Sequence, residues 1–217
     1  SSAATCVNLP GQNAIGTVGP VIPGSEVRIA DDGEILIKGP GVMKQYWGLD
    51  EATAETLIDG WLHTGDLGSI DARGHLSITG RKKELIITAG GKNIAPAPIE
   101  GPLAASPYIG HVVVHGDKRK FLSALVTLDL DNITSYAEQH GFSVDSAAEA
   151  ATHPEILTLI QGVFDGVNAS LPKYSTIKKF AILPVEFETG EELTPTLKVK
   201  RRMVEDKFAA NLDAMYT

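Results

Sequence analysis

The sequence predicts an α+β fold, with a β-rich unit at residues 1–80 and a mixed α and β unit at residues 81–217. Two patterns support this division. The first unit has two hairpin patterns, in which turn residues separate alternating segments, and the second has a long segment with helical periodicity. Strands and helices follow one another irregularly in the second unit, which favours α+β over a regular parallel βαβ array. A chain of 217 residues is long enough for two units of ordinary domain size.

Two hairpins and one short helix are expected in the β-rich unit. The first hairpin reverses at Asp31-Asp32-Gly33, which has the Asp-Gly chemistry of a tight turn. The second reverses at residues 71–74, where Gly74 can adopt the positive φ that such a turn often requires. Residues 50–57 combine an acidic start with helix-forming residues and are expected to form the helix. The expected strands are residues 26–30, 34–38, 67–71 and 75–79.

Three helices and three strands are expected in the second unit. The longest helical segment begins with Thr152-x-x-Glu155, which is typical of a capping box, and continues with apolar residues on one face until Pro172. The acidic segment 186–192 is expected to be a solvated, mobile loop. The expected helices are residues 96–105, 152–171 and 204–215, and the expected strands are residues 111–115, 121–128 and 177–183.

The charge distribution argues against nucleic acid as a partner and indicates where a polyanion could bind. A net charge of −8 argues against general affinity for nucleic acid, which needs an excess of clustered Lys and Arg. Residues 1–80 hold 10 acidic and 4 basic residues, whereas basic clusters occur at residues 81–83, 118–120 and 198–202. A site for a polyanion is therefore expected in the second part of the chain.

Cysteine content and hydropathy favour a cytoplasmic protein. Cys6 is the only cysteine, so no intrachain disulfide can form and a reducing compartment is the simplest expectation. No apolar run approaches the roughly 20 residues that span a bilayer, so peripheral association is the form of membrane contact that stays open. His111 and His115 lie four residues apart on an expected strand, and no Cys or carboxylate joins them, so no metal site is expected.

Three segments carry a resemblance to a known family. They are Gly60-Trp61-Leu62-His63-Thr64-Gly65-Asp66, Gly80-Arg81-Lys82-Lys83-Glu84-Leu85 and Thr196-Leu197-Lys198-Val199-Lys200-Arg201. In this order they resemble the last three signature regions of the AMP-forming adenylate-forming enzymes, and they are most similar to the long-chain acyl-CoA synthetase branch. The resemblance implies that residues 1–80 are the small barrel-like end of a large adenylating domain and that residues 81–217 are a mobile α+β C-terminal lid. The family's Ser/Thr/Gly-rich phosphate loop does not occur in the sequence. The chain is therefore expected to be a C-terminal piece of a larger enzyme, inactive by itself.

The resemblance assigns nucleotide binding and a hinge to three residues. Asp66 matches the carboxylate that holds the ribose of ATP and of the acyl-adenylate, although its tripeptide alone favours an ordinary turn aspartate. Arg81 matches a ribose-binding arginine. Lys83, two residues later, matches the hinge at which the smaller domain swings between adenylating and thioester-forming arrangements. Without the resemblance, residues 81–84 would be interpreted as a charged surface linker.

The resemblance also implies a site for CoA. Gly91 matches the glycine at which the backbone closely approaches the pantetheine arm of CoA in the second half-reaction. Residues 89–93 alone are typical of a flexible turn. Glu100 matches a common carboxylate in the following helix, and no catalytic role is assigned to it.

Lys198 matches the catalytic lysine of the family. Such a lysine reaches the substrate carboxylate and the α-phosphate and stabilises charge as the carboxylate attacks phosphorus. Family members commonly read Gly-Lys-x-x-Arg, whereas Leu197 precedes the lysine here. The register selects Lys198 and places Arg201 at the arginine position, with Lys200 as a rival. A basic stretch of this kind that merely interacts with solvent is the alternative interpretation.

The implied function is that of a fatty acid CoA ligase. ATP and a carboxylate give acyl-AMP and pyrophosphate, and the thiol of CoA then displaces AMP. The implied substrates and cofactors are a fatty acid, ATP, CoA and Mg²⁺, with the Mg²⁺ ligands mostly outside this chain. Two alternatives stay open: an adenylating enzyme that loads a carrier protein, and a non-catalytic lid or interaction module.

Overall fold

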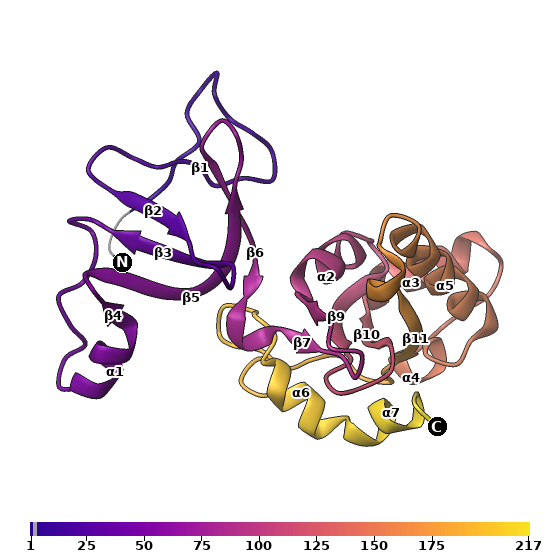
Figure 1. Cartoon of the computed structure of the whole chain (residues 1–217). Helices are drawn as coiled ribbons and strands as arrows, with labels where there is room; N and C mark the ends of the chain where they lie inside the picture. Colours follow the sequence, from indigo (N-terminus) through magenta and orange to yellow (C-terminus); the bar gives the residue numbers. More distant parts are fainter. Residues whose placement is uncertain (2–3) are drawn as a thin grey trace. The chain divides into compact units, whose positions relative to one another are not determined.

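The computed structural model describes Ser1 and residues 4–217, and the chain forms two compact units, Ser1–Leu85 and Ile86–Thr217 (Figure 1). Helices and strands are both present, with most of the helices in the second unit. The predicted α+β class is confirmed. The units divide after Leu85, whereas the sequence pattern predicts a boundary after residue 80, and the functional domain border stays a prediction.

An antiparallel sheet forms the first unit. Its strand order is β1-β6-β5-β3-β2, and β4 pairs with the first residues of β5. In the part of the chain that the structure describes, this sheet is open, with β1 and β2 at its edges. The short helix α1, Asp50–Thr56, precedes β4, as the sequence predicts. The strands are β1 Gly19–Pro20, β2 Glu26–Ile29, β3 Glu34–Lys38, β4 Leu57–Ile58, β5 Trp61–Ile70 and β6 His75–Arg81.

Both predicted hairpins are confirmed, and local chemistry explains them. Gly33 has a φ of +86° in the turn between β2 and β3, and Gly74 has a φ of +81° in the turn between β5 and β6. In the second turn, the Asp71 carboxylate accepts a hydrogen bond from the backbone N–H of His75 at 2.9 Å. One strand is longer than expected. Because β5 extends over Trp61–Ile70, Asp66 lies inside this strand, whereas the expected strand begins at residue 67.

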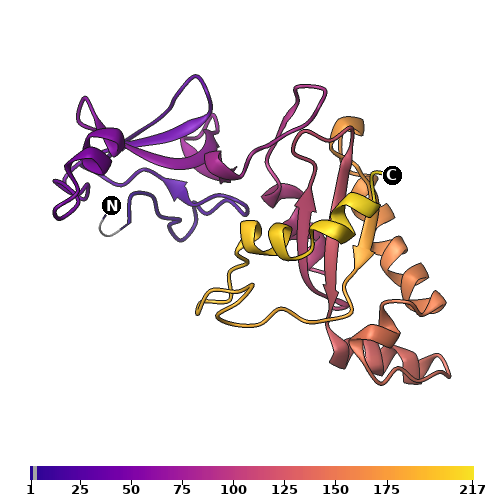
Figure 2. The ribbon, with the colours of Figure 1, turned by 90° about the horizontal axis from the view of Figure 1, so that it is seen from below.

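A three-stranded sheet organises the second unit, in the order β11-β10-β9. The central strand β10 pairs antiparallel with β9 and parallel with β11. All residues of β10 are buried, and α6 and α7 cross one face of the sheet (Figure 2). The elements are β7 Ile86–Ile87, β8 Asn93–Ile94, α2 Ala97–Ala104, β9 Ile109–His115, β10 Leu122–Leu128, α3 Leu130–Gln139, α4 Ala147–Ala150, α5 Pro154–Asn168, β11 Ile177–Ile182, α6 Arg201–Lys207 and α7 Ala209–Ala214.

Neighbouring residues of the edge strand β9 contribute to two different cores. Val114 packs into the larger core, which also contains the buried side chains of α2, α3 and α5. Val113 packs into the smaller core, together with Val204 of α6 and Leu212 of α7. This alternation follows from the period of two along a strand. The smaller core therefore holds the C-terminal helices that follow the basic cluster at residues 198–202.

The predicted capping box is wrong. α5 begins at Pro154 with His153 as its N-cap residue, and no side chain caps it. The hydroxyl of Thr152 instead donates to the backbone oxygen of Glu149 at 3.2 Å. Proline suits the first helical position because its φ is already helical and it has no N–H to satisfy. The helix also ends at Asn168, before the predicted end at residue 171.

Three further features of the structure differ from what the sequence predicts. The helix α3, Leu130–Gln139, was not expected from the sequence. The predicted helix 204–215 is instead two helices that meet at Phe208, the first of which begins within the basic cluster. The segment 186–192 is not solvated throughout, because Phe187 is 7% exposed and Glu192 is 1% exposed.

The described residues lack two kinds of feature. No helix there has both the length and the apolar character that a bilayer crossing requires. Nor do three or more His, Cys, Asp or Glu side chains gather there in an arrangement that could hold a metal ion.

Candidate functional site

Asp66 and Arg81 form an ion pair on neighbouring strands. They are register partners in the β5–β6 ladder, and Arg81 Nε lies 2.9 Å from Asp66 Oδ1. The side chain of Asp66 is 28% exposed and that of Arg81 is 61% exposed, so both are accessible from solvent. A carboxylate accepts hydrogen bonds from hydroxyls, and a guanidinium donates them in a planar fork. The pair therefore has the chemistry to bind the vicinal hydroxyls of a ribose.

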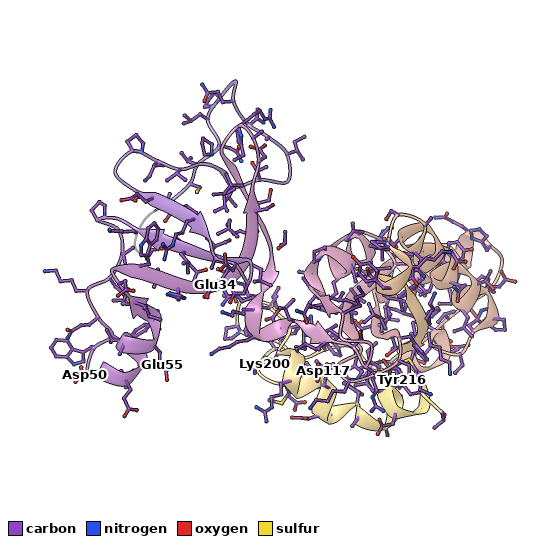
Figure 3. The ribbon with its side chains drawn as sticks, viewed as in Figure 1. Glu34, Asp50, Glu55, Asp117, Lys200 and Tyr216 are labelled. Atoms are coloured by element: carbon purple, nitrogen blue, oxygen red, sulfur yellow. The ribbon has the colours of Figure 1, made fainter. Side chains whose placement is uncertain are left out.

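Glu34, at the start of β3, supports the strand that carries Asp66 (Figure 3). It is 4% exposed, and its Oε1 accepts the backbone N–H of Gly65 at 2.8 Å. Its Oε2 lies 3.0 Å from Lys82 Nζ and 3.1 Å from His63 Nδ1. Burial raises the pKa of Glu34, but these three groups outweigh burial and hold the pKa below its usual value.

The sequence analysis did not identify Glu34. The available signal was an acidic residue that opens an otherwise apolar strand, directly after the Asp31-Asp32-Gly33 turn. Such a residue can as easily lie exposed at the strand end. Its burial depends on the pairing of β3 with β5, which brings Glu34 opposite Leu67.

Arg81 lines an open cavity of about 860 Å³ within the first unit. Arg81, Lys82 and Lys83 give its wall three consecutive cations, and the backbone of Gly65 also borders it. The volume lies in the range of ordinary small-molecule sites. Asp66 lines a smaller hollow of about 210 Å³, and Thr64 borders both spaces. Glu34, Glu55 and Glu84 line the larger cavity as well, so its wall carries charges of both signs.

Lys83 lies in a single exposed 3-10 turn, Lys82–Glu84, that directly follows β6. Within the described residues its side chain makes no hydrogen bond or ion pair, and the first unit ends shortly afterwards at Leu85. Lys82 in the same turn is bonded to Asp32 and Glu34, whereas Lys83 makes no such bond in the part of the chain that is described, and a short exposed segment of this kind can absorb a change in backbone dihedrals. The hinge assignment to Lys83 stays a prediction.

Gly91 lies in the turn between β7 and β8. Its φ is +72°, and its N–H donates to the backbone oxygen of Thr88 at 2.8 Å. An added Cβ would meet no atom within 4 Å among the described residues. The conformation of the turn is therefore sufficient reason for glycine at this position, and the predicted close approach of CoA stays a prediction.

Lys198 lies at the tip of a compact segment that we call the Lys198 hairpin, residues 188–200. The N–H of Leu197 donates to the Thr194 oxygen at 2.8 Å, and the N–H of Thr194 donates to the Lys198 oxygen at 2.8 Å. Leu197 has a φ of +59°, in the left-handed region that glycine adopts most easily. These features match a three-residue hairpin loop that ends in a left-handed residue. They explain why glycine suits the position before the lysine, where this chain has leucine.

The two candidate lysines differ in their surroundings. Lys200 is half-buried, and its Nζ donates to the backbone oxygen of Gly190 at 2.7 Å (Figure 3). Lys198 is exposed, and its ammonium has no hydrogen-bond or ion-pair partner in the described part of the chain. Its backbone is held by the Thr194 hydroxyl, which accepts the Lys198 N–H at 3.0 Å. Lys198 is thus the lysine whose charge is available to a ligand.

Comparison with known proteins places this arrangement in a family. Residues 83–217 match the family model described as the AMP-binding enzyme C-terminal domain, which is more than half of the chain. The chain belongs to this family. The predicted resemblance is thereby confirmed.

Relatives of this AMP-binding enzyme C-terminal domain include two fatty acid ligases. The Long-chain-fatty-acid–CoA ligase FadD15 of Mycobacterium tuberculosis is 46% identical over 205 residues, which cover 93% of this chain and 34% of the relative. The human Long-chain-fatty-acid–CoA ligase ACSBG1 is 38% identical over 226 residues, which cover 91% of this chain and 31% of the relative. The chain thus spans about a third of the length of these relatives.

Solved structures of related enzymes share the fold. The O-succinylbenzoate coenzyme A synthetase MenE of Bacillus subtilis, in complex with AMP, has a TM-score of 0.67 and 27% identity, covering 94% of this chain and 38% of that one. The ATP-bound MatB of Rhodopseudomonas palustris has a TM-score of 0.61 and 29% identity, covering 89% of this chain and 36% of that one.

Arg201 and Glu100 form a structural pair in this C-terminal domain. Arg201 Nη2 donates to the Glu100 carboxylate at 2.7 and 2.8 Å, and its Nη1 donates to the backbone oxygen of Val114 at 2.8 Å. Glu100 also accepts the Val114 N–H at 2.7 Å. These contacts join α2, β9 and the start of α6, which explains an arginine three residues after Lys198 without a direct role in chemistry.

Proposed function

We propose that the chain is the C-terminal part of an AMP-forming long-chain fatty acid CoA ligase of the cytoplasm. The full enzyme activates a fatty acid with ATP as acyl-AMP and pyrophosphate and then transfers the acyl group to the thiol of CoA. The observation that carries the proposal is the pairing of Asp66 with Arg81 on an accessible sheet, in a chain related over most of its length to named fatty acid CoA ligases.

Each site residue has a role that suits its surroundings. Asp66 and Arg81 bind the ribose, as acceptor and donor respectively. The exposed ammonium of Lys198 stabilises negative charge as the carboxylate attacks the α-phosphate. Lys83 is the hinge between the two half-reactions, and Gly91 lines the path of the pantetheine arm.

Mg²⁺ would accompany ATP, as it does in a solved MenE structure in complex with ATP and magnesium ion. The described residues hold no cluster of three or more acidic, His or Cys side chains. The roles proposed for Asp66, Arg81 and Lys198 are binding of the ribose and stabilisation of charge by the protein's own side chains. The Mg²⁺ ligands in the full enzyme are expected to be phosphate oxygens and residues outside this chain.

Half-reaction measurements on the full-length enzyme test this proposal. Lys198→Ala should slow acyl-AMP formation by roughly 10² to 10³, the usual loss on removing one preorganised charge-stabilising donor. Thioester formation from supplied acyl-AMP and CoA should change much less. Lys200→Ala is the matched control, because the ammonium of Lys200 is already bonded to Gly190.

Four results would contradict the proposal. Equal loss of both half-reactions in Lys198→Ala, or a larger adenylation defect in Lys200→Ala, would show that the lysine is wrongly assigned. Turnover that needs a carrier protein and not CoA would favour the carrier-loading alternative. Fatty-acid-dependent exchange of ATP with pyrophosphate by the 217-residue chain alone would contradict its expected inactivity.

A further inference from the structure

Among its described residues, the Lys198 hairpin contains no extended strand, and its two arms are joined by separate backbone hydrogen bonds, from the N–H of Thr194 to the Lys198 oxygen and from the N–H of Lys200 to the Glu192 oxygen. It contains two isolated β-bridges, both of which involve Leu193. Leu197 at its tip adopts a left-handed φ, which is unfavourable for a residue with a side chain. A loop of this kind needs an anchor if it is to hold one conformation.

Glu192 is such an anchor inside the hairpin. Its side chain is 1% exposed, and its Oε2 accepts the backbone N–H of Glu188 at 3.0 Å. Its Oε1 accepts a hydrogen bond from the ammonium of Lys207 in α6. The backbone oxygen of Glu192 also accepts the N–H of Lys200 at 2.7 Å. A single buried residue therefore bonds to both arms of the hairpin and to a neighbouring helix.

The carboxylate of Glu192 is stable in its buried position because it is paired. Burial raises the pKa of Glu192, but Lys207 and the Glu188 N–H outweigh burial and lower the pKa overall. An ionised carboxylate without these partners would be costly at this depth. The hairpin must therefore keep its position against α6 for the charge to stay satisfied.

The helix α6, which carries Lys207, is itself held in place by packing and hydrogen bonds. Val204 of α6 is fully buried in the smaller core. Arg201, the first residue of α6, is bonded to Glu100 and to the backbone oxygen of Val114. Lys198 therefore lies between two anchored positions in the sequence, one at Glu192 and one at Arg201.

We propose that Glu192 is a positioning residue for Lys198, because its pairing with Lys207 fixes the hairpin that presents the Lys198 ammonium. The inference rests on the proposed function, in which Lys198 acts in adenylation. Glu192 contacts no substrate in this scheme and acts through the hairpin. A displacement of about 1 Å can cost about 10² in rate, so loosening the hairpin should slow the step that uses Lys198.

The test compares three single variants of the full-length enzyme and the double variant Glu192→Gln/Lys207→Met. Glu192→Gln keeps the side-chain volume and removes the charge, and Lys207→Met removes the partner. Glu191→Gln is the matched control, because Glu191 also accepts a hydrogen bond from Lys207, at 2.8 Å, but its side chain is 61% exposed. Acyl-AMP formation and thioester formation from supplied acyl-AMP are measured separately in single turnovers.

Glu192→Gln and Lys207→Met should each slow acyl-AMP formation about 10-fold or more and leave thioester formation within about 2-fold. The double variant should be no slower than the worse single variant, because the two residues act as one pair. Glu191→Gln should leave both steps within about 2-fold. Exchange of the Lys200 amide hydrogen should be faster in Glu192→Gln, because loss of the charged bond to Lys207 loosens the segment whose backbone oxygen, at residue 192, accepts that N–H.

Several outcomes would overturn the inference. Unchanged adenylation and unchanged Lys200 exchange in Glu192→Gln would show that the hairpin does not need this anchor. Parallel loss of both half-reactions with a lower unfolding temperature would mean that Glu192 contributes only to stability. If Lys198→Ala slows adenylation and Glu192→Gln does not, this inference fails alone. If Lys198→Ala has no effect on adenylation, the lysine assignment fails with it.

Discussion

Glu34→Ala is expected to destabilise the first unit by about 3 kcal/mol, and Glu34→Gln by about 1 kcal/mol. A hydrogen bond to a charged group contributes about 1.5–3 kcal/mol, and the bond from the Gly65 N–H at 2.8 Å belongs to this class. The side chain of Lys82 is 44% exposed, so solvent screening reduces its bond to about 0.5–1 kcal/mol. Gln keeps one acceptor oxygen for Gly65 and loses mainly the charge, whereas Ala loses every contact.

Urea unfolding followed by tryptophan fluorescence measures this effect in the unit concerned. The chain has two tryptophans, Trp47 and Trp61, and both lie in the first unit. Because the folded pKa of Glu34 is lowered from 4.5, its ionised form contributes stability that is fully present above about pH 4.5. That contribution is lost as the pH falls through the folded pKa. The advantage of the wild type over Glu34→Gln should therefore shrink below pH 4.5.

Two results would refute this reasoning about Glu34. A difference between wild type and Glu34→Gln that stays constant from pH 7 to pH 3 would show that the carboxylate charge is not its source. Equal losses in Glu34→Gln and Glu34→Ala would show that the acceptor for the Gly65 N–H contributes nothing. Lys82→Met should reproduce only the smaller, screened part of the loss.

Three further changes have expected outcomes. Gly68→Ala should destabilise the first unit by about 2–3 kcal/mol, because the new Cβ would lie 2.4 Å from the backbone oxygen of Ser77. Urea unfolding measures this loss of stability. Gly162→Ala is the neutral or stabilising control, because its new Cβ would meet no described atom within 4 Å. Leu197→Gly should raise the free energy of unfolding by about 0.5 kcal/mol, since relief of the left-handed strain exceeds the entropy cost of glycine. Thermal unfolding measures this gain, and Leu197→Ala should show none. The Lys83→Pro variant of the full-length enzyme should still form acyl-AMP but should not transfer the acyl group to CoA, because proline fixes φ at the expected hinge. Single-turnover measurements of both steps test this, and equal loss of both steps would point to misfolding instead.

Local sequence chemistry predicted the hairpins well. The Asp31-Asp32-Gly33 turn and the Asp71–Gly74 turn each contain a glycine with positive φ, a preference that acts within a few residues. The helix α3 could also have been predicted, because the Asp129 carboxylate accepts the N–H of Asn132 at 3.0 Å in an N-cap. An aspartate ahead of a helical segment is a local signal, so the sequence already contained it.

Competing local signals misled the prediction at the start of α5. Thr152 and Glu155 have the spacing of a capping box, but Pro154 between them takes the first helical position. The helix therefore begins after His153, and the Thr152 hydroxyl bonds back to Glu149. The capping-box pattern and the preference of proline for the first helical position overlapped, and the backbone constraint of proline decided where the helix begins.

Motif order alone was sufficient to predict the family of this chain, and it assigned functions to Asp66, Arg81 and Lys198 that stay predictions. The sequence determined the family because residue types and short spacings carry it. The tertiary structure decided which charges are buried and what they bind: Glu34 of β3 bonds to the strand that carries Asp66, and Glu192 bonds within the Lys198 hairpin and to Lys207. The burial of a carboxylate depends on strand register and on partners such as Lys207, which lies 15 residues away from Glu192, so no local pattern contains it.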